Sequence, residues 1–246
     1  MIPFPGGTSV SLLRVYDWPA PDGIDPDGRA GAGGGSPHLH TASSEGYVVI
    51  GGSGAVQTLG ADGCTETVLE PGVVAWFTPG VVHRLINHGD LEILVVMSNA
   101  GLPEAGDAVL TVPPDVLADA ERYRAATTLP SIEDAGEEVV ARSSRARRDL
   151  ALNGYADLRS RVEADGPGAL ADLHAAAARL VAGRASAWQQ IWSEILEPIG
   201  AGTAAALADL ADGRGPHLAD GRFSRARTRP GPERFGMCGR LRTWPI

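Results

Sequence analysis

The sequence predicts a mainly β protein with an α-helical C-terminal region, in which an antiparallel sandwich or barrel occupies residues 7–100. Short apolar or alternating runs such as GYVVIGG, VVAWF and EILVVMSN follow one another closely in this part of the chain. Gly, Pro, Asp and Ser separate these runs, as turns separate strands. After residue 100 the apolar residues recur instead at the 3.6-residue period of a helix.

The composition limits the classes of protein to consider. The chain has 246 residues, and no apolar run approaches the ~18 residues that span a bilayer. The N-terminus lacks the basic and apolar segments of a signal peptide, so we expect a cytoplasmic protein that does not bind membranes. Cys64 and Cys238 are far apart and belong to no CxxC motif. We therefore expect two reduced thiols and not a disulfide or a cysteine-rich zinc site.

Charge is unevenly distributed along the chain. Residues 1–135 contain 5 arginines against 17 acidic residues, and residues 136–246 contain 16 arginines against 13. The acidic first part argues against nucleic-acid binding there, because phosphate contacts need clustered positive charge. The one basic cluster, RSSRARRDL at 142–150, has no aromatic residues beside it, so we interpret it as a solvated helix face.

Three regions are expected: a β-barrel over 7–100, a linker with a short helix over 101–136, and an α-helical region over 137–246. Pro114 is a suitable first residue for the short helix. Helices are expected near 137–163 and over 168–199, where an apolar stripe includes Trp188 and Trp192. This stripe must be covered by the barrel, by the other helices or by a partner chain.

Two further segments, 20–37 and 213–246, are rich in Gly and Pro. The tail 213–246 predicts an irregular or docked C-terminus. The Gly/Pro/Asp-rich segment 20–37 predicts a loop, either a lid or a plain connection.

A pair of histidines begins the candidate site. His38 and His40 are one residue apart, Glu45 follows after four residues, and Gly52 follows after six more. Side chains alternate between the faces of a strand, so the two imidazoles point the same way. Tyr47 shares the face of Glu45 in the following strand.

A second run, EPGVVAWFTPGVVHRLINHG, supplies His83 three residues after Gly80, and Asn87 four residues later. Together the two runs resemble the motifs of the cupin superfamily, commonly written G-x5-H-x-H-x(3,4)-E-x6-G and G-x5-P-x-G-x2-H-x3-N. Ala32 stands at the first glycine position, and Pro79 comes one residue late, directly before Gly80. The resemblance covers residues 7–100 and implies a double-stranded β-helix, or jelly-roll barrel, followed here by the helical extension.

The resemblance implies a metal site whose ligands are His38, His40, Glu45 and His83. If these faces line the barrel interior, three imidazoles and one carboxylate converge. Such a set suits divalent Fe, Mn, Ni, Cu or Zn and does not choose among them. A barrel that binds its ligand without a metal is the alternative.

Two function classes follow for a small-molecule ligand. The first is a mononuclear metalloenzyme, dioxygenase-like or sugar isomerase- or epimerase-like, with lyase or decarboxylase chemistry also typical of small cupins. In it Glu45 would act as general base. Tyr47 is a candidate proton donor or hydroxyl anchor, and a plain wall residue is the favoured alternative. The second is a binding or sensing cupin without turnover, whose helical region forms a homodimer or contacts a partner.

Two further histidines receive structural interpretations. His88, in NHGD, is expected in a turn, and His174 is expected as a packed core residue on the apolar stripe. Trp188 and Trp192 are expected as core or interface anchors.

Overall fold

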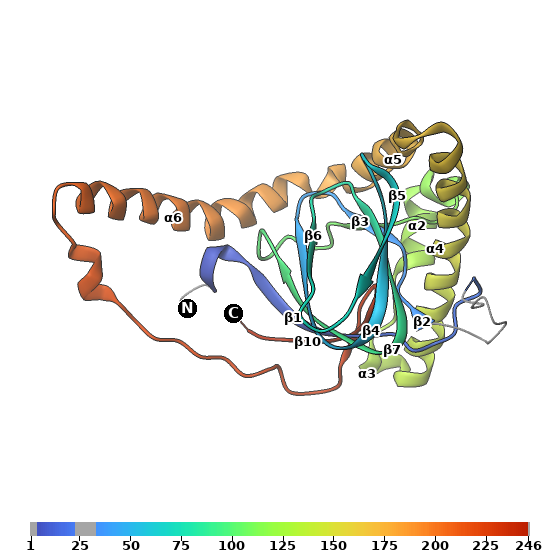
Figure 1. The fold of residues 1–246 in the computed structure, drawn as a ribbon, viewed down its shortest axis with the longest axis horizontal. Coiled ribbons are helices and arrows are strands. Elements are labelled where there is room, and N and C mark those ends of the chain that lie inside the picture. The colour runs from blue at the N-terminus through green and yellow to red at the C-terminus, as the bar shows by residue number, and fades with distance from the viewer. Residues whose placement is uncertain (1–3, 23–32, 246) are drawn as a thin grey trace.

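A computed structural model describes residues 4–22 and 33–245 of the chain, so the predicted loop over 20–37 lies largely outside the described residues. The β part is a single sheet that curls into a barrel (Figure 1). Its strands are β1 (Ser9–Val15), β2 (Gly33–Gly34), β3 (His38–His40), β4 (Glu45–Gly60), β5 (Gly63–Leu69), β6 (Val74–Phe77), β7 (Val82–Met97), β8 (Ala108–Leu110), β9 (Arg234–Phe235) and β10 (Gly239–Thr243).

Two long antiparallel strands, β4 and β7, form the centre of the sheet. They pair from Glu45↔Met97 to Leu59↔Val82, and the register shifts near Gly52. A Cβ at Gly52 would lie 2.1 Å from the carbonyl oxygen of Asp90, and its φ is +71°, so only glycine fits this bulge. The bulge bends both strands and lets the sheet close.

The remaining strands extend this central pair. The sheet order is β5-β4-β7-β1-β10-β9, with β6 paired to β4, β2 and β3 paired to β7, and β8 paired to β3. Every strand pair is antiparallel, as the closely spaced apolar runs predict. The jelly-roll barrel and its helical extension therefore match the predicted fold class.

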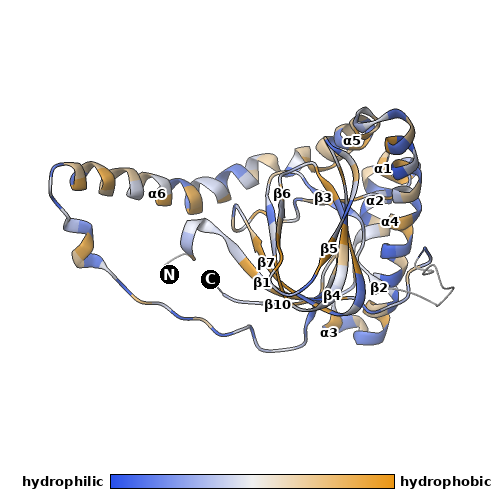
Figure 2. Cartoon of the chain, viewed as in Figure 1, coloured by the Kyte–Doolittle hydropathy of each residue, from blue (hydrophilic) through white to orange (hydrophobic). Residues whose placement is uncertain are grey.

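Two hydrophobic cores hold the molecule together. The first fills the barrel with inward-facing residues that include Tyr47, Leu85 and Ile93. The second lies between the outside of the barrel and the helices, and includes Val109, Tyr155 and Leu173. In Figure 2 parts of the barrel strands are coloured as hydrophobic, and the helices carry both hydrophobic and hydrophilic segments. The helices therefore form a layer on one side of the barrel.

The helices are α1 (Pro114–Leu117), α2 (Ala120–Thr127), α3 (Ile132–Ala135), α4 (Glu137–Asp165), α5 (Ala171–Val181) and α6 (Ala185–Ala211). The short helix predicted to start at Pro114 is broken into α1 and α2. Asp119 causes the break, because its side chain accepts hydrogen bonds from the backbone of Glu121 and Arg122 and caps a new helix. None of the helices in the described part of the chain is long and apolar enough to cross a bilayer.

The apolar stripe predicted over 168–199 is divided between α5 and α6. A short 3-10 segment, Ala182–Arg184, separates the two helices. Trp188 is buried as expected, whereas Trp192 is 43% exposed. Trp192 therefore lies on the exposed side of α6, whereas Ile191 and Ile195 pack against Gly101, and Leu196 packs against Gly7.

The C-terminus returns to the barrel. β10 pairs with β1 over Ser11↔Thr243 to Val15↔Gly239, so the tail contributes a strand. β8 likewise lies outside 7–100 but pairs with β3. The sheet thus draws strands from all three expected regions, because its edges are satisfied by segments that are distant in sequence.

The basic cluster at 142–150 is not wholly a solvated face, and that interpretation is wrong for two of its arginines. Arg147 and Arg148 are buried. The guanidinium of Arg148 donates hydrogen bonds to the carbonyl oxygens of Trp18 and Pro19, at 2.8 and 2.9 Å. Arg147 donates to the carbonyl oxygen of Gly236 at 2.7 Å. These arginines pair with backbone carbonyls and so fasten helix α4 to both ends of the chain.

Candidate metal centre

Four side chains that the sequence singled out meet inside the barrel. His38 and His40 are the ends of β3, Glu45 is the first residue of β4, and His83 is the second residue of β7. One ligand atom from each lies within 4.8 Å of the others. The exposed fractions of the four residues are 2, 8, 7 and 1% in sequence order. The structure therefore brings all four predicted ligand residues together.

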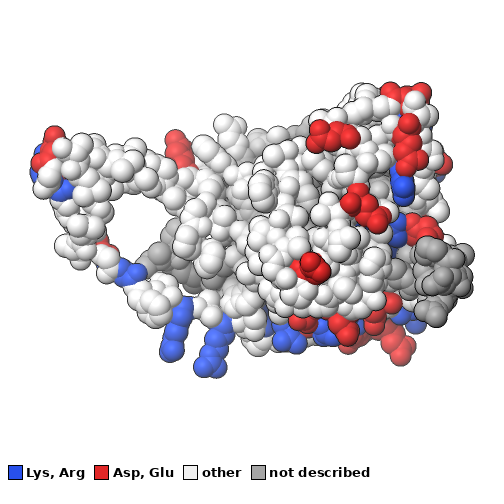
Figure 3. Space-filling model, in the orientation of Figure 1, with Lys and Arg blue, Asp and Glu red and all other residues white. Residues whose placement is uncertain are grey.

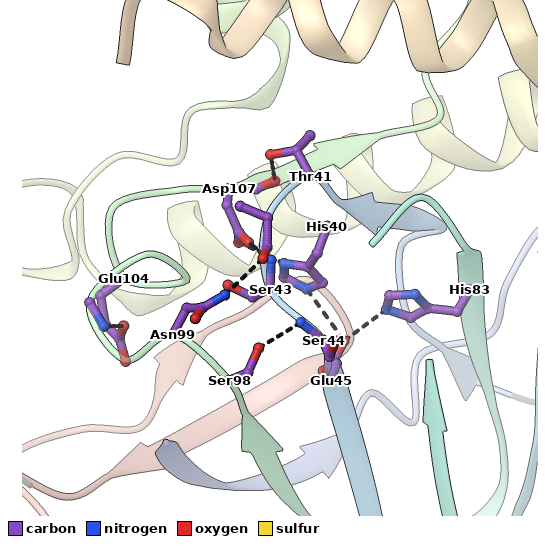
Figure 4. A network of polar contacts seen from close by, with 12 residues as sticks. His40, Thr41, Ser43, Ser44, Glu45, His83, Ser98, Asn99, Glu104 and Asp107 are labelled. Atoms are coloured by element: carbon purple, nitrogen blue, oxygen red, sulfur yellow. Dashed lines mark hydrogen bonds and ion pairs between the residues drawn. The ribbon is translucent and has the colours of Figure 1, made fainter. Parts of the chain in front are cut away.

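Strand pairing explains how distant residues meet. His38 pairs directly with His83 across β3 and β7, which places their imidazoles 4.2 Å apart between ring centroids. The turn between His40 and Glu45 is held at Ser44, whose backbone N–H donates to Ser98 Oγ at 2.9 Å. Figure 4 shows this turn directing His40 and Glu45 toward His83.

Each imidazole is oriented by a hydrogen bond on its outer nitrogen. Nδ1 of His38 lies 2.9 Å from the carbonyl oxygen of Ser36, and Nδ1 of His83 lies 3.2 Å from that of Val81. Nδ1 of His40 lies 2.7 Å from Oδ1 of Asp107. Because these oxygens accept, Nδ1 carries the hydrogen in each ring. The Nε2 atoms are then the ones available to a metal ion.

The atoms that face the centre lack ordinary partners. His83 Nε2 and Glu45 Oε2 are buried without a well-formed hydrogen bond to any described residue. Oε2 of Glu45 lies 3.0 Å from His83 Nε2 and 3.3 Å from His40 Nε2. Buried polar atoms without partners are costly, and a shared cation would satisfy both of them. The donor set therefore fits a metal ion.

The ionisable side chains of the centre differ in the direction in which their pKa values are shifted. Burial, with the nearby imidazoles of His83 and His40, holds the pKa of His38 well below its ordinary value. Burial opposes protonation of His40 as well, but its hydrogen bond to Asp107 and its close contact with the Glu45 carboxylate raise its pKa to about 10. Burial would raise the pKa of Glu45, yet the imidazoles of His83 and His40 hold that pKa well below the ordinary value. Glu45 is thus a carboxylate in this centre.

Asp107 is a site residue that the sequence analysis missed. Its carboxylate is fully buried and contacts both His40 and the turn, because Oδ2 accepts a 2.9 Å hydrogen bond from the backbone N–H of Ser43. The hydrogen bond to His40 lowers the pKa of Asp107, although burial opposes this shift. Its position just before β8 brings it to the site, and no local pattern marked it.

Tyr47 lies two residues after Glu45 in β4, on the same face of the strand. Its ring packs edge-on against Phe77 at 5.0 Å, and its centroid is 6.4 Å from that of His83. The hydroxyl is fully buried and has no well-formed hydrogen bond to a described residue. Burial, and then the charge of Glu45, raises the pKa of Tyr47 well above its ordinary value. Tyr47 therefore keeps its proton and can donate it in a hydrogen bond.

Comparison with known proteins identifies the barrel. No curated protein matches the sequence. Residues 29–97 match the family model described as a cupin domain. The barrel is a cupin domain.

Several solved structures resemble parts of this cupin domain and its surroundings. The capsular polysaccharide assembling protein CapF from Staphylococcus aureus is 20% identical, with a TM-score of 0.27, over 39% of this chain and 24% of its own. A predicted oxalate decarboxylase from Thermotoga maritima is 25% identical, with a TM-score of 0.24, over 27% and 56%. WlaRA, a TDP-fucose-3,4-ketoisomerase from Campylobacter jejuni, is 11% identical, with a TM-score of 0.30, over 40% and 64%. The chain thus spans less than two thirds of the length of each of these structures.

The other positions of the cupin motifs have structural roles. The side-chain amide of Asn87 donates to the carbonyl oxygen of Val15 at 3.0 Å, and its Oδ1 accepts from the backbone of Gly89 and Leu91. Asn87 therefore ties the bulged region of β7 to β1. Ala32, at the first glycine position, lies outside the described residues.

The remaining histidines lie away from the cupin centre. His88 is exposed within β7, close to the bulge, and not in a separate turn. The expectation that His174 packs in the core is wrong, because it is exposed on α5 and its Nε2 lies 2.9 Å from the carbonyl oxygen of Gly80. That hydrogen bond joins α5 to the loop that precedes His83.

Proposed function

We propose that the cupin domain binds one divalent transition-metal ion and acts as a mononuclear metalloenzyme on a small molecule. Its ligands in this proposal are His38, His40, Glu45 and His83. The observation that carries the proposal is the orientation of the imidazoles: each Nδ1 is engaged by an acceptor, which leaves the three Nε2 atoms facing Glu45. A shared cation would satisfy the inward-facing atoms of these buried imidazoles and this carboxylate.

The donor set suits Fe, Mn, Ni, Cu or Zn, since nitrogen ligands with one carboxylate are common to all of these ions. A bound ion of this class supplies Lewis-acid polarisation of a substrate oxygen, and a redox-active one also supplies O2 chemistry. Four protein ligands leave room for substrate or water.

The residues around the centre define what the chain itself contributes. Glu45 is a carboxylate that can accept a proton from a substrate held beside it, and Tyr47 offers a hydroxyl that can donate a hydrogen bond to a substrate oxygen. Phe77 stacks on the His83 ring at 4.4 Å, and Met97 is buried on the adjoining strand, so water is largely excluded.

The barrel interior favours an apolar small molecule over a sugar. Its lining is dominated by apolar side chains, and Tyr47 supplies a hydroxyl beside the centre. Binding a sugar normally requires several polar partners for its hydroxyl groups. We therefore propose dioxygenase-like chemistry first, with sugar isomerisation or epimerisation as the second reaction class.

Metal analysis of the purified full-length protein tests the proposal. We expect about one transition-metal ion per chain by elemental analysis, loss of that ion in His83→Ala, and retention in the matched control His174→Ala. After reconstitution with Fe(II), we expect O2 uptake with small apolar substrates. Wild-type protein that takes up none of the five metals would contradict the metal site. Metal binding without turnover of any candidate substrate would favour the alternative function, a sensing cupin.

A further inference from the structure

The C-terminal part of the chain carries a positive charge, although the chain as a whole has a net charge of −9. Residues 221–246 contain seven arginines and one acidic residue, Glu233. Four of these arginines lie in the eight-residue sequence RFSRARTR, residues 222–229, which we call the arginine segment. The positive charge is therefore concentrated in a short stretch of an acidic protein.

The arginine segment is exposed throughout and belongs to no helix or strand. Its end is held against the barrel, because the backbone N–H of Arg229 donates a 2.8 Å hydrogen bond to the carbonyl oxygen of Thr243 in β10. The guanidinium groups form no ion pair with any described residue; they belong to Arg222, Arg225, Arg227 and Arg229. Unlike the buried Arg147 and Arg148, these four arginines are accessible to an anion in solution.

The arginines of the segment recur at a regular interval. One residue separates Arg225 from Arg227, and one separates Arg227 from Arg229, so in an extended chain their side chains point the same way, about 7 Å apart. Figure 1 shows the chain drawn out between α6 and β9, and Figure 3 shows basic side chains projecting from the lower edge of the molecule, where this tail runs. A row of this kind suits an anion that repeats along a polymer, because a small anion contacts only one or two of the arginines.

Two hollows lie along the arginine segment. The larger, of about 1240 Å³, is lined by all four arginines and by the rings of Phe4 and Trp244. The smaller, of about 800 Å³, is lined by Arg229 and Phe235 among others. Both hollows include residues 228–230 in their walls, so they adjoin one another. Together they form a track that follows the segment and can hold several units of a polymer.

Aromatic side chains accompany the arginines. Phe223, inside the segment, is 90% exposed, and Phe4, on the wall of the larger hollow, is 42% exposed. Proteins hold single-stranded nucleic acids with such a combination, in which bases stack on aromatic rings while arginines follow the phosphates. A duplex presents its base edges in its grooves, which helices or strands enter, and the segment is neither. The basic cluster at 142–150, by contrast, contains no aromatic residue.

We infer that the arginine segment binds single-stranded RNA, whose phosphates pair with the arginines and whose bases stack on Phe223 and Phe4. A guanidinium group donates two parallel hydrogen bonds to a phosphate, which gives arginine an advantage over a simple point charge. Ser224 and Thr228 lie between the arginines and expose hydroxyl groups that can pair with the 2′-hydroxyl of ribose. The acidic remainder of the chain repels a polyanion, so the RNA contacts the segment and its two hollows alone.

Fluorescence anisotropy of the full-length protein with a labelled oligouridine of ~12 nucleotides tests this inference. At low salt we expect a dissociation constant of about 100 µM or lower, and a slope of about −3 for the logarithm of affinity against that of salt concentration, as four phosphate contacts predict. The double change Arg225→Gln with Arg227→Gln should raise the dissociation constant at least about tenfold and make that slope shallower by about 1. The matched control, Arg124→Gln with Arg179→Gln, removes the same charge from exposed positions on α2 and α5 and should bind as the wild type does.

Phe223→Ala separates stacking from charge. We expect the dissociation constant to rise by about fivefold or more with the salt slope unchanged. Leu218→Ala, at an exposed apolar residue just before the segment, is the control and should have no effect. None of these residues belongs to the metal centre, so the result does not depend on the proposed function.

Several outcomes would overturn the inference. Oligouridine that does not bind, or that binds the arginine-segment variant and its control equally well, would exclude the segment as an RNA site. Oligothymidine that binds as tightly as oligouridine would contradict the assignment to RNA, and tighter binding of a duplex RNA would contradict the assignment to single strands. Binding of phosphatidylserine vesicles without binding of oligouridine would assign the arginines to a membrane surface instead.

Discussion

The carboxylate of Asp107 accepts a 2.7 Å hydrogen bond from Nδ1 of His40, a residue 67 positions earlier in the chain. The same carboxylate accepts from the backbone of Ser43, so one buried group orients a proposed ligand and holds the turn that precedes Glu45. Partners of this kind on the far nitrogen of a ligand histidine fix its tautomer and strengthen its bond to metal.

Asp107→Asn should therefore weaken metal binding without removing a ligand. The amide offers one acceptor oxygen where the carboxylate offered two, so the bonds from His40 and Ser43 cannot both be kept. We expect the dissociation constant for the metal to rise by about 10–100-fold, measured by competition with a chelator. Asp62→Asn, on an exposed turn, is the control. A variant that loses stability but keeps its metal affinity would limit Asp107 to holding the turn.

Tyr47→Phe should separate substrate interaction from metal binding. The hydroxyl is buried and without a well-formed hydrogen bond, so its removal costs the fold little. We expect metal content to stay at the wild-type level and kcat/KM to fall by about tenfold to a hundredfold, the effect of losing one hydrogen bond to a substrate oxygen. Unchanged kinetics on a substrate of the wild-type enzyme would assign Tyr47 to the barrel wall.

Local rules predict only part of the proposed ligand set. Alternation along a strand puts His38 and His40 on one face, and the same rule puts Tyr47 beside Glu45. His83 could be placed only through the resemblance to cupin motifs, because its meeting with His38 depends on pairing between distant strands. Asp107 depends on such a pairing as well, but no motif marks it.

Long-range contacts also explain the errors. The arginines at 147 and 148 look solvated in sequence, and only the carbonyl oxygens of distant segments make their burial possible. The tail predicts an irregular or a docked C-terminus, and it docks as β10; the sequence does not reveal the strand because its partner, β1, lies at the opposite end of the chain. His174 shares the period of an apolar stripe but falls at its exposed margin.

Arg148→Met should destabilise the fold, since it leaves the carbonyl oxygens of Trp18 and Pro19 without their donor. Removing one partner of a buried, charge-assisted hydrogen bond costs far more than removing an exposed charge. We expect a loss of about 3 kcal/mol in the free energy of unfolding, measured in urea. Arg142→Met, on the exposed face of the same helix, should change it by less than about 1 kcal/mol. Equal effects of the two changes would contradict this role for Arg148.

Thiol labelling should report whether the segment before β10, which carries Cys238, stays packed against the barrel. Cys238 is 5% exposed, and burial raises the pKa of its thiol well above the ordinary value. Cys64 is partly exposed on the outer sheet, and its pKa is raised as well, first by desolvation. We expect native protein to react slowly at Cys64 and not at Cys238, and denatured protein to react at both. In Cys64→Ser, native labelling should disappear; rapid labelling of that variant would mean that the segment before β10 opens readily.

Gly154→Ala should lower stability even though alanine is the better helix former. In an exposed helix interior this change stabilises by about 1 kcal/mol. Gly154 instead lies where α4 crosses the chain after β8, and a Cβ there would be 2.1 Å from the carbonyl oxygen of Thr111. That atom belongs to the backbone and cannot move aside, so α4 must shift and the contacts of Tyr155 and Leu158 with the second core are disturbed. We expect the free energy of unfolding, measured in urea, to fall by about 1–3 kcal/mol, the usual cost of overpacking.

Gly168→Ala, where an added Cβ meets nothing within 4 Å, is the control and should be neutral or stabilising. If Gly154→Ala proved as stable as the control, the close approach of α4 to the barrel would be wrong.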